Sequence, residues 1–219
     1  MSTPIPEAAG RHTATLVQPA PTPTAVADPA PLGLAAFGMT TLVLSVFNAG
    51  LLAKNLEPVV LPLALFYGGL AQMLAGMWEF RNRNVFGATA FTSFGAFWLS
   101  FAAYVKFIAP GLPANSAHSA AGLFLLGWTI FTVYMLVASL RVNAAVAAVF
   151  LLLSFTFILL TIADYGSYTG LGKAGGYMGL ATAAAAGYAS FAGVVNATWG
   201  RVVLPVLPLA RDNTAREGQ

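Results

Sequence analysis

The feature that most constrains this chain is a series of six apolar segments, each close to the length, roughly 20 residues, that a helix needs to cross a bilayer. The segments are Leu32–Ala53, Val59–Phe80, Phe86–Ile108, Ala117–Leu140, Val142–Ala163 and Gly175–Trp199. They lack the polar face that a helix of a soluble bundle turns to water. The pattern predicts an all-α integral membrane protein in which six transmembrane helices form a bundle.

The composition supports lipid as the surrounding medium. Charged residues make up 8% of the 219 residues and hydrophobic residues 58%, whereas a soluble domain is about 25% charged. So few charges cannot cover the surface of a soluble fold of this size. The basic residues stand singly at the ends of apolar segments, so we expect no nucleic-acid partner.

The chain divides into three parts. Residues 1–27 are rich in Pro, Ala and Thr and are predicted to be a disordered tail. Residues 28–205 form the predicted six-helix transport domain, and residues 206–219 a polar C-terminal tail, expected to be mobile.

An even number of spans puts both termini on one side of the membrane. That side carries Arg11, Arg81, Arg83, Arg141, Arg201, Arg211 and Arg216. The other side carries Lys54, Lys106 and Lys173. The positive-inside rule then predicts cytoplasmic termini, and the short loops favour a prokaryotic inner membrane.

Few residues in the sequence are of the types and spacings that catalysis requires. There is no cysteine, and the two histidines, His12 and His118, lie outside the interior of the apolar segments. No nucleophile–base pair, carboxylate pair, phosphate loop or metal-ligand spacing lies within the segments. We therefore expect no catalysis, no cofactor and no metal.

The membrane segments do contain neutral polar residues. Phe37, Thr41, Ser45 and Asn48 share one helical face. The predicted polar lining of a pathway consists of Thr41, Asn48, Gln72, Thr92 and Thr156. Most Ser and Thr inside membranes bond their own helix, but buried amides need partners or a wet cavity. Such a lining suits a small carboxylate or a neutral small molecule.

Glu79 is the one acid near a helix interior, and Gln72 shares its face. Its position just before Arg81 and Arg83 favours an interfacial ion pair. A role in accepting a proton is the alternative interpretation.

The first segment opens with DPAPLGL, a start in which Asp28 can cap free backbone N–H groups and proline is tolerated in the first turn. This resembles the NPAPLGL of the acetate uptake transporter family, which includes the succinate–acetate permeases. The motif residues are Asp28, Pro29, Ala30, Pro31, Leu32, Gly33 and Leu34. Further stretches resemble the family in register: FYGGLAQMLAGMWEF at 66–80, TAFTSFGAFWLS at 89–100 and GRVVLP at 200–205.

The resemblance implies a ring of protomers, a homohexamer, with one pathway through each six-helix bundle. In the family the pathway narrows at a Phe, a Tyr and a Leu from spans one, three and five. By motif these correspond to Phe37, Phe94 and Phe155. Hydrophobic constrictions of this kind gate by excluding water.

The resemblance further implies transport of acetate and related small monocarboxylates, with succinate as a further candidate. Proton-coupled uptake is the preferred mechanism, because bringing a bare anion into a negative interior costs about 2.3 kcal/mol per 100 mV. A passive channel for acetate, or for a neutral solute such as ammonia, is the alternative. A non-transporting scaffold, whose polar residues only join helices, is the rival from another class.

Overall fold

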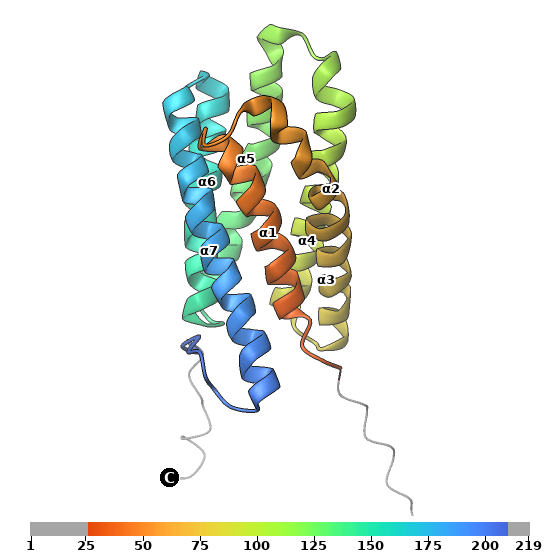
Figure 1. Cartoon of the computed structure of the whole chain (residues 1–219), viewed down its shortest axis with the longest axis vertical. Helices are drawn as coiled ribbons and strands as arrows, with labels where there is room; N and C mark the ends of the chain where they lie inside the picture. Colours follow the sequence, from red (N-terminus) through yellow and green to blue (C-terminus); the bar gives the residue numbers. More distant parts are fainter. Residues whose placement is uncertain (1–25, 210–219) are drawn as a thin grey trace, which may run out of the picture.

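The computed structural model describes residues 26–209, so most of the predicted tail 1–27 and all of 210–219 lie outside the described residues. Six helical stretches of this range are long and apolar enough to cross a membrane, which confirms the expected number of spans. Figure 1 shows them as one elongated bundle, with both ends of the described chain at the same end. In chain order the elements are α1 (Ala30–Asn48), η1 (Lys54–Val59), α2 (Val60–Leu65), η2 (Phe66–Ala71), α3 (Gln72–Arg81), α4 (Val85–Ala103), η3 (Tyr104–Ile108), η4 (Ala109–Gly111), α5 (Ala114–Ser139), α6 (Ala144–Gly166) and α7 (Thr169–Trp199).

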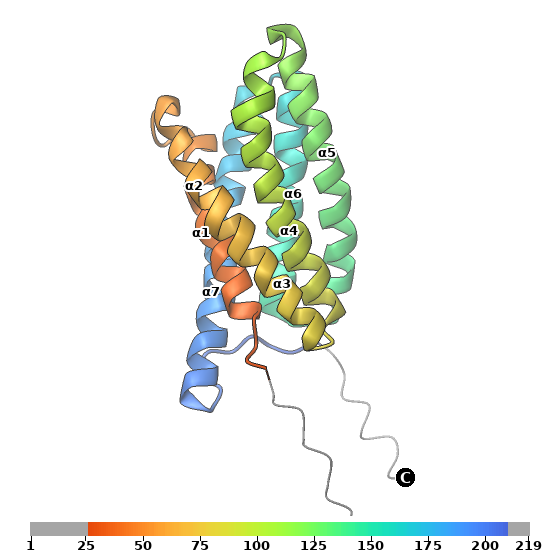
Figure 2. The same cartoon turned by 90° about the vertical axis from the view of Figure 1, so that its right-hand side faces the viewer.

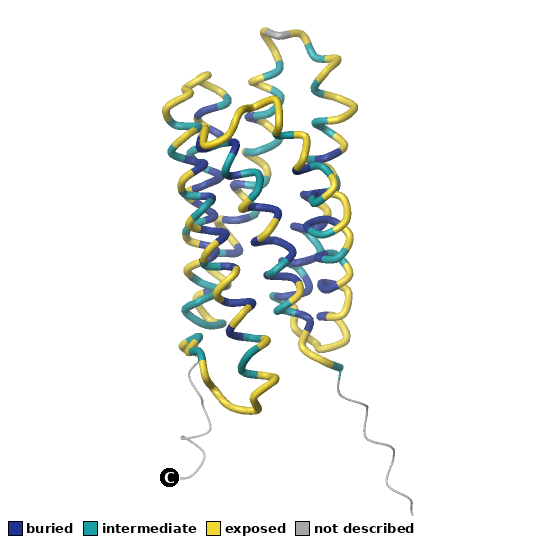
Figure 3. Tube along the Cα trace, viewed as in Figure 1, coloured by how far each residue is buried: buried dark blue, intermediate teal, exposed yellow. Residues whose placement is uncertain are grey.

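The spans are neighbours in a closed arrangement. Helix α1 packs between α7 and the second span (α2, η2 and α3), α6 packs between α5 and α7, and α3 packs on α4 (Figure 1 and Figure 2). Small residues allow the closest approaches, because helices in lipid associate through backbone packing. A Cβ atom on Gly38 would lie 3.3 Å from the Ala183 carbonyl oxygen, and one on Gly95 would lie 2.6 Å from the Met73 backbone nitrogen. Figure 3 shows the buried positions on the inner faces of the helices.

The second span is not a uniform α-helix. Its middle, η2, is a π-helical turn that contains the Gly68–Gly69 pair. A Cβ on Gly68 would lie 2.6 Å from Thr40 Oγ1, so glycine lets this turn press against α1. Single π turns are frequent at functional sites, and this one directly precedes Gln72, the first residue of α3.

The helix ends follow local chemistry. Asn84 and Asn143 are N-caps: their Oδ1 atoms accept hydrogen bonds from the backbone N–H of Gly87 at 3.0 Å and of Val146 at 2.8 Å. The predicted connection 164–174 is wrong. Helix α6 runs to Gly166 and α7 begins at Thr169, because Ser167 adopts a left-handed conformation (φ 52°) and reverses the chain in a tight turn.

The end of the described chain forms a C-terminal strap, residues 200–209, whose last four residues belong to the predicted tail 206–219. The Ala144 N–H donates to the Leu207 oxygen at 2.9 Å, and the Leu209 N–H donates to the Val142 oxygen at 3.2 Å. These bonds hold the strap along the start of α6, where the free N–H groups of a helix N-terminus need acceptors.

The side chain of Asn196, on α7, fixes the other half of the strap. Its Oδ1 accepts from the N–H of Val203 at 2.7 Å and of Leu204 at 2.9 Å, and its Nδ2 donates to the Leu204 oxygen at 2.8 Å. The Tyr188 hydroxyl adds a hydrogen bond to the Pro205 oxygen at 2.7 Å. The strap therefore joins the end of α7 to the start of α6.

Candidate functional site

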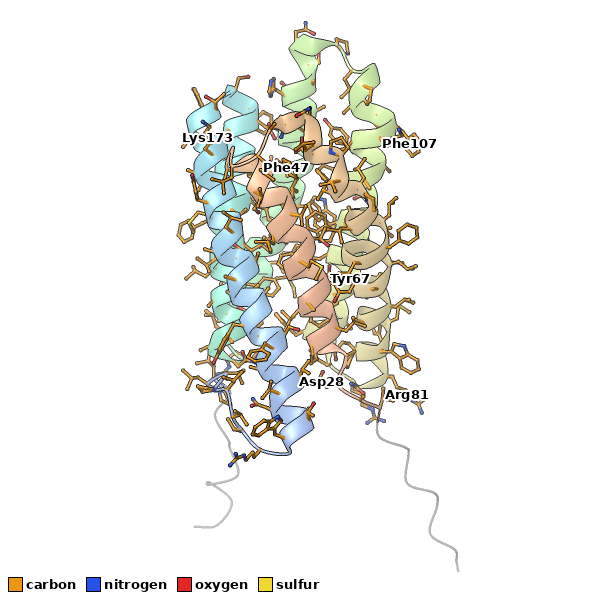
Figure 4. The ribbon with its side chains drawn as sticks, viewed as in Figure 1. Asp28, Phe47, Tyr67, Arg81, Phe107 and Lys173 are labelled. Atoms are coloured by element: carbon orange, nitrogen blue, oxygen red, sulfur yellow. The ribbon has the colours of Figure 1, made fainter. Side chains whose placement is uncertain are left out.

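Two cavities lie one above the other inside the bundle. The proximal vestibule, of about 280 Å³, lies toward the end that holds both described termini; its polar lining comprises Asp28, Gln72, Glu79, Asn84, Asn143 and Asn196. The distal vestibule, of about 440 Å³, lies toward the opposite end; its polar lining includes Thr41, Ser45, Asn48, Thr156, Asp164 and Lys173. Figure 4 marks the two ends, with Asp28 near one and Lys173 near the other.

An apolar partition separates the vestibules. Phe37 and Leu153 line both cavities, whereas Phe94 lines the proximal one and Phe97 the distal one. All four side chains are buried, and the rings of Phe37 and Phe94 lie 5.5 Å apart between centroids. We call these four residues the apolar partition.

Phe155 does not belong to the partition, and its predicted place in the constriction is wrong. Its side chain is 50% exposed on the outer surface of α6, while Leu153 is 3% exposed and faces the vestibules. At 3.6 residues per turn, positions two apart point to nearly opposite faces of a helix. The family resemblance therefore predicted the correct turn of α6 for the constriction, but a residue on the opposite face of the helix.

The polar face of α1 lines the distal vestibule. Thr41, Ser45 and Asn48 all contribute to its wall, about one, two and three turns from Phe37. Thr40, next in sequence, instead donates its hydroxyl to the Ala36 oxygen at 2.8 Å, as helical Thr in membranes commonly does. The buried hydroxyl of Thr41 has no hydrogen-bond partner in the described part of the chain. It remains free to bind a solute or water.

Thr156 and Thr92 take different positions. Thr156 lines the distal vestibule and donates its hydroxyl to the Leu152 oxygen at 2.9 Å, 3.2 Å from the Thr182 hydroxyl. Thr92 lines neither vestibule; it packs against Gly76 where α4 meets α3. The predicted lining role of Thr92 is therefore wrong, because the Gly76 contact turns the residue toward the second span.

Gln72 and Glu79 line the proximal vestibule from α3. Each side chain is 1% exposed, and one oxygen of each, Oε1, has no hydrogen-bond partner among residues 26–209. The other carboxylate oxygen of Glu79 accepts a hydrogen bond from Asn84 Nδ2 at 3.0 Å. Glu79 makes no ion pair within the described residues, so the predicted pairing with Arg81 and Arg83 is not formed. Buried polar groups without partners are costly, which marks this wall as a place for a ligand or water.

The DPAPLGL motif seats the start of α1 beside the proximal vestibule. Asp28 Oδ1 accepts a hydrogen bond from the Ala30 N–H at 2.9 Å, as its expected capping role requires. Pro29 precedes the helix, and the Pro31 oxygen accepts a hydrogen bond from the Ser190 hydroxyl of α7 at 2.7 Å. A Cβ on Gly33 would lie 2.6 Å from the Phe91 ring, so this glycine permits the contact between α1 and α4.

The remaining motif residues have no shared polar role. Leu34 is buried and Leu32 is 45% exposed. The motif thus positions α1 and contributes one charge, that of Asp28, to the vestibule.

The mouth of the distal vestibule is mixed in charge. Lys54 forms an ion pair with Glu57 at 2.7 Å, and His118 Nδ1 lies 3.7 Å from Asp164 Oδ1. Lys173 makes no ion pair with the described residues and packs along Gly50 at the end of α1. A carboxylate approaching from this end meets lysine nitrogens and the hydroxyl and amide groups of α1.

Several residues of this site were not predicted from the sequence, among them Leu153, Asn143 and Asn196. Leu153 could have been found from the face that Phe150, Ser154 and Phe157 share with it on α6. Asn143 and Asn196 gave no signal: Asn143 reaches the vestibule from the turn before α6, and Asn196 from the last turn of α7. Within the described range no three His, Asp, Glu or Cys side chains gather as a metal site would require.

The fold and the two vestibules define a multi-pass membrane protein with a partitioned polar path through its bundle. Residues 10–211 match the model of the GPR1/FUN34/yaaH family, and the chain belongs to this family. It is 43% identical over 173 residues to Ammonia transport outward protein 2 of Saccharomyces cerevisiae, covering 77% of this chain and 61% of that protein. It is 38% identical over 183 residues to the Succinate-acetate/proton symporter SatP of Escherichia coli K12, covering 84% of this chain and 96% of that protein.

Among solved structures, that of the bacterial acetate channel SatP superposes with a TM-score of 0.78 at 38% identity, covering 83% of this chain and 99% of that one. The chain spans 66% and 61% of the length of the two yeast relatives Accumulation of dyads protein 2 and Ammonia transport outward protein 2.

Proposed function

We propose that this protein carries acetate and related small monocarboxylates across a membrane, together with protons, through the two vestibules of each protomer. The observation that carries the proposal is the pair of polar-lined vestibules that meet at Phe37 and Leu153. The likeness to a succinate-acetate/proton symporter and to an acetate channel supports the choice of substrate. Succinate is a further candidate on the same ground.

The apolar partition determines which protonation state of the substrate can cross. An ionised carboxylate loses its hydration between Phe37, Phe94, Phe97 and Leu153, and these side chains offer no hydrogen bond in return. The neutral acid has no charge to desolvate and carries no charge against the membrane potential. Acetate therefore binds in the distal vestibule as the anion, takes up a proton there, and passes the partition as acetic acid.

Glu79 is the residue that we expect to receive the proton. Its free Oε1 faces no cation in the described part of the chain, and its partner Asn84 donates only to Oε2. The acid O–H passes its proton to the Glu79 carboxylate, which leaves the acetate anion and a neutral Glu79. One proton and one carboxylate then leave on the same side.

The exposed surface and the distribution of arginines support our proposal for the assembly and its placement in the membrane. Large apolar side chains cover the outer faces, for example Phe155 and Phe191, which are 50% and 58% exposed. Lipid and neighbouring protomers in a homohexameric ring would cover these side chains. With every arginine on the side of the termini, we place both termini in the cytoplasm of a cell whose inner membrane holds the protein.

The test is uptake of radiolabelled acetate into proteoliposomes, with and without an imposed pH gradient. We expect the gradient to stimulate uptake by the native protein, and Phe94→Ala to alter the rate. Glu79→Gln should lose most of the stimulation; full pH-dependent uptake by this variant would refute the role of Glu79. Uptake that ignores the gradient in the native protein would indicate a passive channel.

Ammonia is the second candidate, because one relative is named as an outward ammonia transporter and a neutral molecule could cross the same partition. An acetate-independent flux of ammonia in the same vesicles, with no acetate uptake, would replace the first proposal by this one.

A further inference from the structure

The two vestibules differ in the charges that line them. In the distal vestibule Lys54 and Lys173 offset Glu57 and Asp164. The proximal vestibule is lined by Asp28 and Glu79, with no lysine, arginine or histidine among its described lining residues. Neither acid makes an ion pair in residues 26–209. One end of the path is therefore balanced in charge, and the other is acidic.

The buried side-chain oxygens of the proximal vestibule likewise favour a ligand that is not an anion. Glu79 Oε1 and Gln72 Oε1, both on side chains that are 1% exposed, lack hydrogen-bond donors in the described chain. Such oxygens accept hydrogen bonds, so they suit a molecule that brings an O–H group, as a protonated carboxyl does. They do not suit a second bare carboxylate.

We propose that Asp28 is a specificity-determining residue, which disfavours dicarboxylates relative to monocarboxylates at the proximal vestibule. This inference rests on the proposed function. A monocarboxylic acid that has taken one proton enters the vestibule neutral. A dicarboxylate that has taken one proton still carries one negative charge, and it meets Asp28 whether or not Glu79 holds a proton.

Asp28 can discriminate in this way because its charge and its structural role are separable. Its Oδ1 caps the Ala30 N–H, and asparagine offers the same oxygen without the charge. The side chain is exposed, so its field is partly screened. The expected effect is therefore moderate, about a tenfold change in relative transport, which equals about 1.4 kcal/mol.

The experiment compares succinate and acetate uptake in proteoliposomes for the native protein, Asp28→Asn, Asp28→Glu and Asp28→Ala, at matched protein content. Asp28→Asn should raise the ratio of succinate to acetate about tenfold, and Asp28→Ala should raise it likewise. Asp28→Glu keeps the charge and should leave the ratio within about twofold of native. The three variants separate charge from capping.

A native ratio in all variants would overturn the proposal, as would a rise in Asp28→Glu equal to that in Asp28→Asn. A second measurement needs no variant. The ratio of succinate to acetate uptake by the native protein should rise with ionic strength, because salt screens an exposed charge. A ratio that stays constant counts against the role of Asp28. If the native protein moves no acetate, the proposed function itself fails; if acetate moves and the ratio ignores Asp28, only this inference fails.

Discussion

Shortening Leu153 to alanine should widen the path, and the structure sets the size of the effect. Leu153 is 3% exposed and lines both vestibules. Leu→Ala removes about three carbon groups, worth roughly 0.8 kcal/mol each on burial. Because cavities already flank the site, the total loss of stability should stay near the lower end for such changes, about 2 to 3 kcal/mol. This predicts a fall in Tm of about 5 to 10 °C.

The same substitution should join the two vestibules beside Phe37. We expect uptake of a bulkier monocarboxylate, such as butyrate, to rise at least about tenfold relative to acetate, since shape selection against extra methylenes is worth about 1 to 3 kcal/mol. Tm in detergent and competitive uptake in proteoliposomes measure both effects. Phe155→Ala is the matched control, two residues away on the outer surface of α6. The reasoning is refuted if Phe155→Ala relaxes selectivity while Leu153→Ala does not.

Two further substitutions test the packing, each with its own control. Gly95→Ala should lower stability by about 1 to 3 kcal/mol, because its Cβ would lie 2.6 Å from the Met73 nitrogen; Gly127→Ala, with open space around it, should be neutral or stabilising by up to about 1 kcal/mol in thermal unfolding. Asn196→Ala removes the hydrogen bonds that hold the strap and should speed amide exchange and proteolysis in residues 200–209. Asn115→Ala, at the exposed start of α5, should leave strap exchange unchanged.

Much of the architecture could be predicted from the sequence because span length and hydropathy are local properties. The count of six spans is confirmed. The face shared by Phe37, Thr41, Ser45 and Asn48 also followed from spacing alone, since all four line the distal vestibule. The helical period of 3.6 residues is enough to predict which residues share a face, and here that whole face points into the bundle.

The site predictions that were wrong share a physical cause: each depended on which other residues a side chain contacts in the folded protein. The choice between Phe155 and Leu153 needs the rotation of α6, which packing decides. Thr92 faces Gly76 because α3 and α4 approach closely there. The Glu79 carboxylate accepts a hydrogen bond from Asn84 across the turn and forms no ion pair with the nearby Arg81 and Arg83. Such contacts come from tertiary structure, and sequence separation does not predict them.

We propose that solute passes through the two vestibules of the bundle, and the absence of cysteine from the sequence allows a direct test. Asn48→Cys places a single thiol in the distal vestibule, and Phe155→Cys places one on the outer surface of α6. The measurement is acetate flux before and after treatment with a thiol-specific methanethiosulfonate reagent. We predict that modification of Asn48→Cys blocks most of the flux and that a reducing agent restores it, while Phe155→Cys keeps its full rate. Complete modification of Asn48→Cys without loss of flux would contradict a path through the vestibules.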